Sequence, residues 1–180
     1  MTARIAPANP PFDSETTDWL DRTMKGNPPL VLFTTLARDP RLFRKFFSAG
    51  LLDRGHLSMR QREIVIDRTT ALCGSEYEWG VHIATFARHV GLTPAQVESF
   101  VKGTPEDECW PEQERTLLRL CDALHRECDI DDALWAALKA DFSDEAIIEL
   151  LMLAGFYRTV SYLTRAMRLP LEAQAARFPH

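Results

Sequence analysis

The chain has 180 residues, of which 46% are hydrophobic, and its formal net charge is −5. A chain of this length and composition can bury one substantial core, which favours a single domain. Nucleic-acid binding is disfavoured, because the net charge is negative and the 21 basic residues are scattered along the chain.

Residues 1–17 are predicted to form a flexible N-terminal arm, because Pro7, Pro10 and Pro11 interrupt regular structure there. Residues 18–180 are predicted to fold as a single all-helical domain. Apolar residues recur in that segment at spacings of three and four, and the alternation typical of strands is missing. About eight helices are expected, and the last and most apolar of them begins after Ser143.

Three helix starts carry the capping-box pattern, in which a Ser or Thr is followed three residues later by Gln or Glu. The pairs are Ser58 with Gln61, Ser75 with Glu78, and Thr93 with Gln96. The second pair predicts that only a Gly-Ser turn separates two successive helices. Strips of side chains on these two helices are therefore expected to face each other.

The most apolar run of the chain, AIIELLMLAGFY, is interrupted by Glu149 and ends before Arg158. It is shorter than the about 20 residues that span a bilayer, so no membrane association is expected. The first residues lack the apolar stretch of a secretory signal. These features predict a soluble, cytoplasmic protein.

The cysteines stand at positions 73, 109, 121 and 128 and form no CxxC pair. Neither a dithiol redox centre nor a metal knuckle is therefore expected, and the cysteines are predicted to be reduced core thiols. Glu78, His82 and His89 offer oxygen and nitrogen donors on one helix. Because no second cluster of donors stands elsewhere, we predict no metal site.

The predicted helix over residues 76–90 concentrates ionisable side chains. Glu78, His82 and His89 share one strip of it, and Glu78 and His82 are one turn apart, where they can share a hydrogen bond. On the preceding helix, Glu63 lies in a mostly apolar strip. Burial there would raise the pKa of the Glu63 carboxyl toward the range useful for proton transfer.

Each of these side chains also has a purely structural explanation. Glu78 would close the capping box with Ser75, and Glu63 would form an ion pair with Arg60 or Arg62. Histidines on a solvated helix face need no function at all. The pattern alone leaves both explanations open.

Two segments resemble the carboxymuconolactone decarboxylase family, within the superfamily of alkyl hydroperoxidase D-like enzymes. The first is RQREIVIDRTTALCGSEYEWGVHIATFARHVGLT, and the second is ELLMLAGFYRTVSYLTRAMRLPLE. The resemblance extends more loosely over most of the chain. It implies an alkyl hydroperoxidase D-like helical fold.

The hydroperoxidases of that superfamily carry a glutamate, a CxxC pair and a histidine. Glu63 and His82 match the glutamate and the histidine, but Ser75 and Glu78 stand at the two cysteine positions. Cys73 lies two residues too early to replace the first cysteine. Because no dithiol can form, the resemblance disfavours peroxidase activity.

The decarboxylase branch implies a cofactor-independent acid/base enzyme, a carboxy-lyase or isomerase, that acts on a small carboxylated lactone from aromatic catabolism or on a related acid. The catalytic residues would be His82 as proton donor, Glu78 as its partner and Glu63 as a second acid/base or orienting group. Ser75 or Tyr77 would donate a hydrogen bond to the substrate.

Trp79 and His89 complete the predicted substrate-binding set, although Trp79 and Tyr77 are equally compatible with core packing. No arginine is assigned to hold a substrate carboxylate. The candidates for that role are Arg68, Arg88 and Arg158.

The resemblance implies no cofactor, a small-molecule substrate and a homo-oligomer, either a trimer or a hexamer. The apolar final helix and the Phe46–Phe47 pair are candidate interface surfaces. The alternative hypothesis is a non-catalytic oligomeric module of the same fold, which binds a small molecule or serves in assembly.

Overall fold

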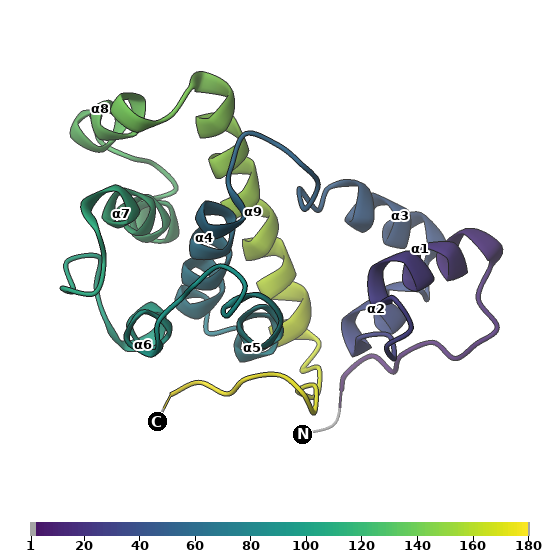
Figure 1. Cartoon of the computed structure of the whole chain (residues 1–180). Helices are drawn as coiled ribbons and strands as arrows, with labels where there is room; N and C mark the ends of the chain where they lie inside the picture. The colour runs from purple at the N-terminus through teal and green to yellow at the C-terminus, as the bar shows by residue number, and fades with distance from the viewer. Residues whose placement is uncertain (1–2, 180) are drawn as a thin grey trace.

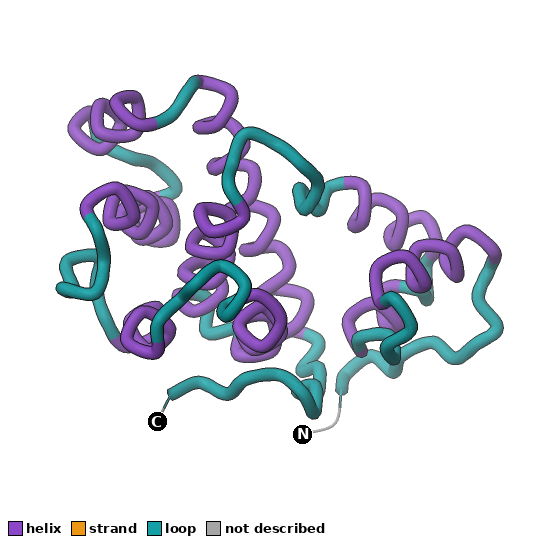
Figure 2. Tube along the Cα trace, in the orientation of Figure 1, coloured by secondary structure: helices purple, strands orange, loops and turns teal. Residues whose placement is uncertain are grey.

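A computed structural model describes residues 3–179 of the chain. Every regular element in that part of the chain is a helix, and Figure 2 shows these helices joined by loops. The predicted all-helical fold class is confirmed. Nine helices are described, where the sequence predicts about eight.

The first three helices form a small N-terminal lobe, which Figure 1 shows set beside the other helices. They are α1 (Ser14–Met24), α2 (Val31–Leu36) and α3 (Pro40–Ser48). The lobe is held together by aromatic rings around Phe47. Its ring centroid lies 5.4 Å from that of Trp19, 4.9 Å from that of Phe33 and 4.5 Å from that of Phe43. Aromatic pairs at these distances stabilise packing beyond the area that they bury.

The segment predicted as an arm includes the first turn of α1. The helix begins at Ser14 because the Asp13 carboxylate caps it, accepting a hydrogen bond from the Thr16 N–H at 2.9 Å. Before α1, the chain also contacts the rest of the protein. The Arg4 N–H donates to the Met167 carbonyl at 2.8 Å, at the end of the last helix.

The remaining helices form a bundle around α4, which packs against α5, α6, α7 and α9. Their bounds are α4 (Met59–Leu72), α5 (Glu76–Phe86), α6 (Pro94–Lys102), α7 (Glu112–Glu127), α8 (Asp132–Asp141) and α9 (Asp144–Ala166). Helices α4 and α7 run parallel. Arg60 near the start of α4 pairs with Glu114 near the start of α7, and Arg68 pairs with Asp122 further along both helices.

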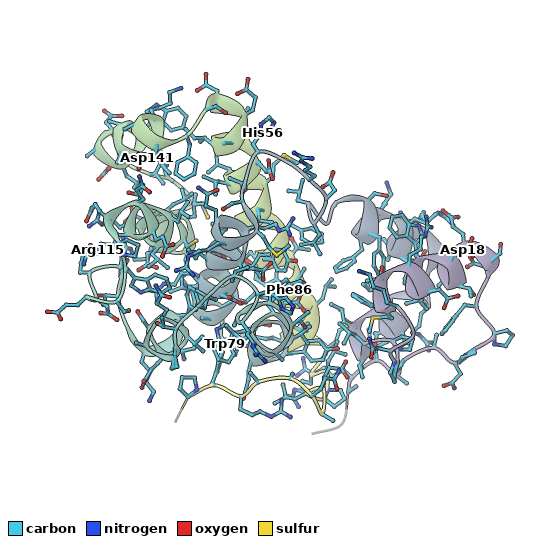
Figure 3. The ribbon with its side chains drawn as sticks, viewed as in Figure 1. Asp18, His56, Trp79, Phe86, Arg115 and Asp141 are labelled. Atoms are coloured by element: carbon cyan, nitrogen blue, oxygen red, sulfur yellow. The ribbon has the colours of Figure 1, made fainter. Side chains whose placement is uncertain are left out.

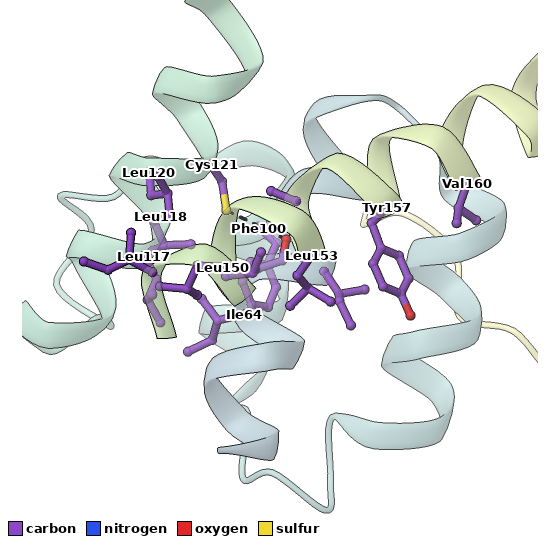
Figure 4. Packing of buried hydrophobic residues seen from close by; sticks show 14 of the residues in the cluster. Ile64, Phe100, Leu117, Leu118, Leu120, Cys121, Leu150, Leu153, Tyr157 and Val160 are labelled. Carbon is purple, nitrogen blue, oxygen red and sulfur yellow. Dashed lines mark hydrogen bonds between the residues drawn. The ribbon is translucent and has the colours of Figure 1, made fainter. Parts of the chain in front are cut away.

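The bundle core forms where α4 meets α7 and α9. Figure 4 shows Ile64 of α4 close to Leu150 and Leu153 of α9, and all three side chains are fully buried. Every residue from 63 to 70 of α4 is buried, including three ionisable ones. A helix that is surrounded by other helices normally buries apolar residues on all sides, so these ionisable side chains need an explanation.

Two of the three predicted capping boxes form, and one does not. The boxes at Ser58 and Thr93 are complete. The predicted box of Ser75 with Glu78 is wrong. Ser75 has φ −85° and ψ 74° instead of extended backbone, and its hydroxyl pairs with the Thr164 hydroxyl at 2.8 Å. A tertiary contact to α9 therefore replaces the local cap and leaves the Glu78 side chain without a capping role.

The C-terminal tail after α9 runs along α5, below the bundle in Figure 1. The Ala176 N–H donates to the Gly80 carbonyl at 3.0 Å, and the Trp79 and Phe178 rings lie 5.0 Å apart. A Cβ atom at position 80 would lie 2.3 Å from the Ala176 carbonyl oxygen. Only glycine therefore permits the tail to approach α5 this closely.

Helix α9 is long and apolar enough to cross a membrane by length and composition alone. Within its most apolar window, 44% of the residues are buried inside the protein. A core helix of a soluble protein meets the same criteria, so this one helix is weak evidence for a membrane span. The cytoplasmic location stays a prediction.

Candidate functional site

The site is built where α5 folds back against α4. The turn between the two helices needs a left-handed residue, and Gly74 provides it with φ +64°. The Ser75 N–H then donates to the Thr70 carbonyl at 2.8 Å, which closes the turn. This sharp reversal places the Glu63 side of α4 opposite the His82 side of α5, as the short Gly-Ser turn predicts.

His82 lies between two carboxylates. Its Nδ1 is 2.7 Å from Oε2 of Glu63, and its Nε2 is 3.5 Å from Oε1 of Glu78. Glu63 is 0% exposed, His82 4% and Glu78 7%. The three residues predicted as catalytic are therefore in contact with one another and shielded from water.

The two carboxylates keep a proton on His82. Burial by itself lowers the pKa of the imidazole, but hydrogen bonds and charge from Glu63 and Glu78 outweigh burial and raise the pKa to about 10. At neutral pH both ring nitrogens of His82 therefore carry a hydrogen. Nδ1–H donates to Glu63, and Nε2–H points toward the more distant Glu78 oxygen.

Several polar atoms of this cluster have no hydrogen-bond partner within the described chain. They are Oε1 of Glu63, Oε2 of Glu78, Oδ1 of Asp67 and Nε of Arg62. Buried polar atoms normally find partners, and exceptions often mark places where function needs the unused capacity. Arg62 Nε is 4.0 Å from Oε1 of Glu63. A positive group therefore lies at the edge of the acid–histidine cluster.

An aromatic wall closes the cluster. The Tyr157 ring of α9 meets the His82 ring edge-on at 5.1 Å, and the Phe86 ring lies 5.4 Å from it. Figure 3 labels Phe86 and Trp79, which both belong to α5. Burial raises the pKa of Tyr157 well above its ordinary value, and charge on Glu78 and Glu63 acts in the same direction. The phenol therefore stays protonated.

The predicted substrate-binding residues on and next to α5 have partners outside this cluster. The Tyr77 hydroxyl donates to the Glu172 carboxylate and accepts from the Leu32 N–H at 3.0 Å, so it ties the tail and the lobe to α5. Trp79 is buried against the tail, and Ser75 contacts α9. His89 is exposed, with Nδ1 3.1 Å from the Thr85 carbonyl oxygen. A substrate contact by any of these four residues stays a prediction.

The arginines considered as carboxylate holders have other partners or lie on the surface. Arg68 donates two hydrogen bonds to Asp122, at 2.7 and 2.9 Å, on the α7 side of α4. Arg158 donates to the Tyr162 hydroxyl at 2.8 Å, and Arg88 is exposed. Arg62 is the arginine that lies against the cluster, although sequence reasoning treats it only as an ion-pair partner of Glu63.

Asp67 and Tyr157 also escape prediction. Asp67 stands four residues after Glu63, so the helical spacing itself was a usable signal. Tyr157 lies in the segment ELLMLAGFYRTVSYLTRAMRLPLE, which resembles the family, but nothing in the local sequence indicates which side of α9 faces His82. Among the described residues no group of three or more His, Cys, Asp or Glu side chains is arranged to hold a metal ion.

Solved structures define the class of fold. An uncharacterized peroxidase-related protein from Ralstonia eutropha JMP134, an alkylhydroperoxidase AhpD core, is 18% identical, with a TM-score of 0.81 over 96% of this chain and 95% of that one. A second peroxidase-related protein, from Silicibacter sp. TM1040, is 20% identical, with a TM-score of 0.83 over 99% of this chain and 96% of that one. The fold is therefore AhpD-like.

The debrominase Bmp8 has the same fold, with 16% identity and a TM-score of 0.77 over 97% of this chain and 95% of that one. No curated protein matches the chain. Residues 40–120 match the model of the carboxymuconolactone decarboxylase family. This segment, which holds Glu63, Glu78 and His82, is similar to that family, and the resemblance seen in the sequence is confirmed.

Proposed function

We propose that the protein is a cofactor-independent acid/base enzyme that protonates carbon in a small organic acid, with His82 as the proton donor. One observation supports the proposal above the others. His82 is buried and lies between two buried carboxylates that each keep an oxygen without a partner. These carboxylates raise the pKa of its imidazole to about 10, which favours the protonated ring at neutral pH. General acids in water-shielded sites have this combination of properties.

The two ring nitrogens of His82 have different tasks in this proposal. Nδ1 is held at 2.7 Å by Glu63, whereas Nε2 lies 3.5 Å from Glu78, beyond a strong hydrogen bond. The Nε2 proton is the easier one to transfer. Glu63 therefore orients the ring and stabilises the imidazolium, and Glu78 guides the proton toward the substrate.

The chemistry needs no electron carrier. When the carbon–carbon bond to a carboxylate breaks, carbon dioxide leaves and the electron pair is delocalised into an enolate. The Nε2 proton of His82 then forms the new carbon–hydrogen bond, and solvent later restores the proton. The Arg62 Nε, buried without a hydrogen-bond partner, supplies positive charge for the enolate oxygen or for a second carboxylate.

A small carboxylated lactone is the substrate that this family implies. Peroxidase activity is disfavoured, because Ser75 and Glu78 stand where the hydroperoxidases carry cysteines. The described cysteines are free thiols, and Cys73 faces His125, with Sγ 4.0 Å from Nδ1, instead of His82. The same argument disfavours a thiol-dependent dehalogenation.

We also propose a homo-oligomer, a trimer or a hexamer. Ile148, Met152 and Tyr162 on α9 are each more than half exposed, and a partner subunit would cover them. Light scattering of the purified protein tests this proposal. A monomer at micromolar concentration would contradict it.

A non-catalytic binding or assembly module is the second candidate, and one observation favours it. Two surface hollows of about 400 and 460 Å³ lie on the N-terminal lobe, and no residue of the acid–histidine cluster lines either of them. A ligand bound there would need no proton transfer.

The decisive experiment measures carbon dioxide release from carboxymuconolactone by wild type, His82→Ala and His56→Ala. His56 is an exposed histidine outside the cluster, so its variant controls for the loss of an imidazole. The proposal expects release by wild type and by His56→Ala, and a loss of about 100-fold or more in His82→Ala. Equal activity of all three proteins would exclude His82 as the acid. No release by a folded wild type would remove this substrate and favour the binding module.

A further inference from the structure

A third carboxyl group is buried beside the His82 cluster. Asp67 is 1% exposed, and its Oδ1 has no hydrogen-bond partner in the described chain. It lies one turn after Glu63 on α4, a spacing that brings two side chains to about 5–6 Å at their Cβ atoms. Asp67 therefore shares the face of α4 that meets His82.

The groups that act on Asp67 come from three helices. His82 and Glu78 act on it by their charge from α5, and Glu63 acts on it by its charge from one turn earlier on α4. Tyr157 of α9 is close enough for Asp67 to affect the phenol. Arg68, the next residue after Asp67, forms an ion pair with Asp122 on the α7 side of α4.

These surroundings favour the neutral form of Asp67. Burial raises the pKa of the carboxyl well above its ordinary value, and the charges of Glu63 and Glu78 raise it further, while the charge of His82 acts in the opposite direction. With His82 positive and Asp67 neutral, the cluster holds two protons for transfer besides the Nδ1 proton that Glu63 holds. One of them is on Nε2 of the imidazolium, and the other is on the Asp67 carboxyl.

An acid at this position is costly unless it has a task. The neighbouring residues Ile64, Val65 and Ile66 are apolar and fully buried, and an apolar side chain at position 67 would avoid the desolvation cost. Asp67 does not offset that cost through an ion pair of its own, since no lysine or arginine pairs with it among the described salt bridges.

We propose that Asp67 is a positioning residue that stores a proton for His82 and returns it after the histidine has protonated the substrate. This inference rests on the proposed acid/base function. His82 first loses its Nε2 proton to the substrate carbon and becomes neutral. The Asp67 carboxyl then gives its proton to the imidazole, Asp67 becomes a carboxylate, and His82 is again an imidazolium. After product release, a proton from solvent neutralises Asp67.

The proposal fixes the order in which the two groups titrate. When alkali removes the first proton from the pair, Asp67 loses it and His82 stays charged. In Asp67→Asn no such proton exists, so the imidazolium must give up its own. The titration midpoint of the His82 ring should then fall by about one pH unit or more, because an opposite charge at this range no longer supports the imidazolium.

The test is an NMR titration that needs no substrate. The ¹³Cγ resonance of Asp67 and the ring resonances of His82 are followed from pH 4 to pH 11 in wild type, Asp67→Asn and Asp107→Asn. Asp107 is a matched control, because its carboxylate is hydrogen-bonded to Ser99 at 2.7 Å, away from His82. The Asp67 resonance is measured in wild type. The proposal can therefore be tested even if Asp67→Asn folds poorly.

The expected result is an Asp67 carboxyl that stays protonated through pH 7 and a lower His82 midpoint in Asp67→Asn alone. Titration of Asp67 below about pH 5 would overturn the proposal. An unchanged His82 midpoint in folded Asp67→Asn would overturn it too. If carboxymuconolactone is not turned over but this titration behaves as expected, the substrate is wrong and the proton store remains.

Discussion

The N-terminal lobe and the helical bundle place aromatic and charged side chains in opposite ways. The lobe of α1–α3 packs aromatic rings around Phe47 and keeps its ion pairs, such as that of Arg44 with Glu15, on the surface. The bundle of α4–α9 buries charged groups in its middle, among them Glu63 and Arg68. Burying charge costs stability, so the bundle has given up stability that the lobe retains.

The difference separates two kinds of buried charge within the bundle itself. Arg68 donates from each of its three side-chain nitrogens, to Asp122 and to three carbonyl groups, and it joins α4 to α6 and α7. Glu63 and Glu78 keep oxygen atoms without partners. A satisfied buried charge is structural, whereas an unsatisfied one indicates a site.

The largest expected effect is on catalysis by Glu63→Gln. The amide keeps the shape of the side chain but removes the charge that holds the His82 imidazolium, so turnover should fall by about 100-fold to 10,000-fold. Carbon dioxide release measures this loss once a substrate is turned over. Glu15→Gln in the lobe is the matched control, since its side chain is half-exposed, and it should keep wild-type activity.

A change in stability should separate Arg68→Ala from Arg44→Ala. Removal of Arg68 takes its ion-pair partner from Asp122 and one donor from each of three carbonyls, and it should lower the free energy of unfolding by about 3–5 kcal/mol. Arg44 is 44% exposed and pairs with Glu15 at 3.3 Å. Its loss should cost less than about 1 kcal/mol. Urea titrations followed by circular dichroism measure both, and equal losses would refute the distinction between lobe and bundle.

Stability should also depend on pH in different ways in the two regions. The pKa of His82 is raised from 6.5 to about 10, so its contribution is fully present below pH 6.5 and is lost as pH rises toward about 10. Hydrogen bonds from Thr16 lower the pKa of Asp13, so its contribution is present above about pH 4 and is lost as pH falls below that.

Two variants should therefore change opposite ends of the stability profile. His82→Gln should flatten the alkaline decline of the unfolding free energy, and Asp13→Ala should flatten the acid decline. Urea titrations at intervals between pH 3 and pH 10 provide the measurement. An alkaline decline that persists in His82→Gln would assign it to another group, such as Asp67.

The parts of the site that could be predicted are those set by local spacing. Glu78 and His82 are one helical turn apart, and the Gly-Ser turn brings Glu63 opposite them. The proximity of these three residues could therefore be predicted from the sequence. The fold class follows from the same periodicity. The match of residues 40–120 to the family then supports the fold from an independent comparison.

The parts that escaped prediction depend on partners far away in the chain. Ser75 carries a complete capping pattern, yet its hydroxyl binds Thr164, 89 residues later. Tyr77 could equally have been core or site until Glu172 and Leu32 supplied its hydrogen bonds. Tertiary contacts of this kind override the local capping and packing preferences of a residue, and no local sequence pattern indicates them.

In other sequences of this kind, the residue at the position of Gly80 predicts the path of the C-terminal tail. Because a methyl group there would collide with the Ala176 carbonyl, any relative with a larger residue at this position must route its last residues elsewhere. Such a relative would expose the Trp79 face of α5, which Phe178 covers here. The residue that a relative carries at the position of Gly80 therefore predicts whether its C-terminal residues cover the helix that carries Glu78 and His82.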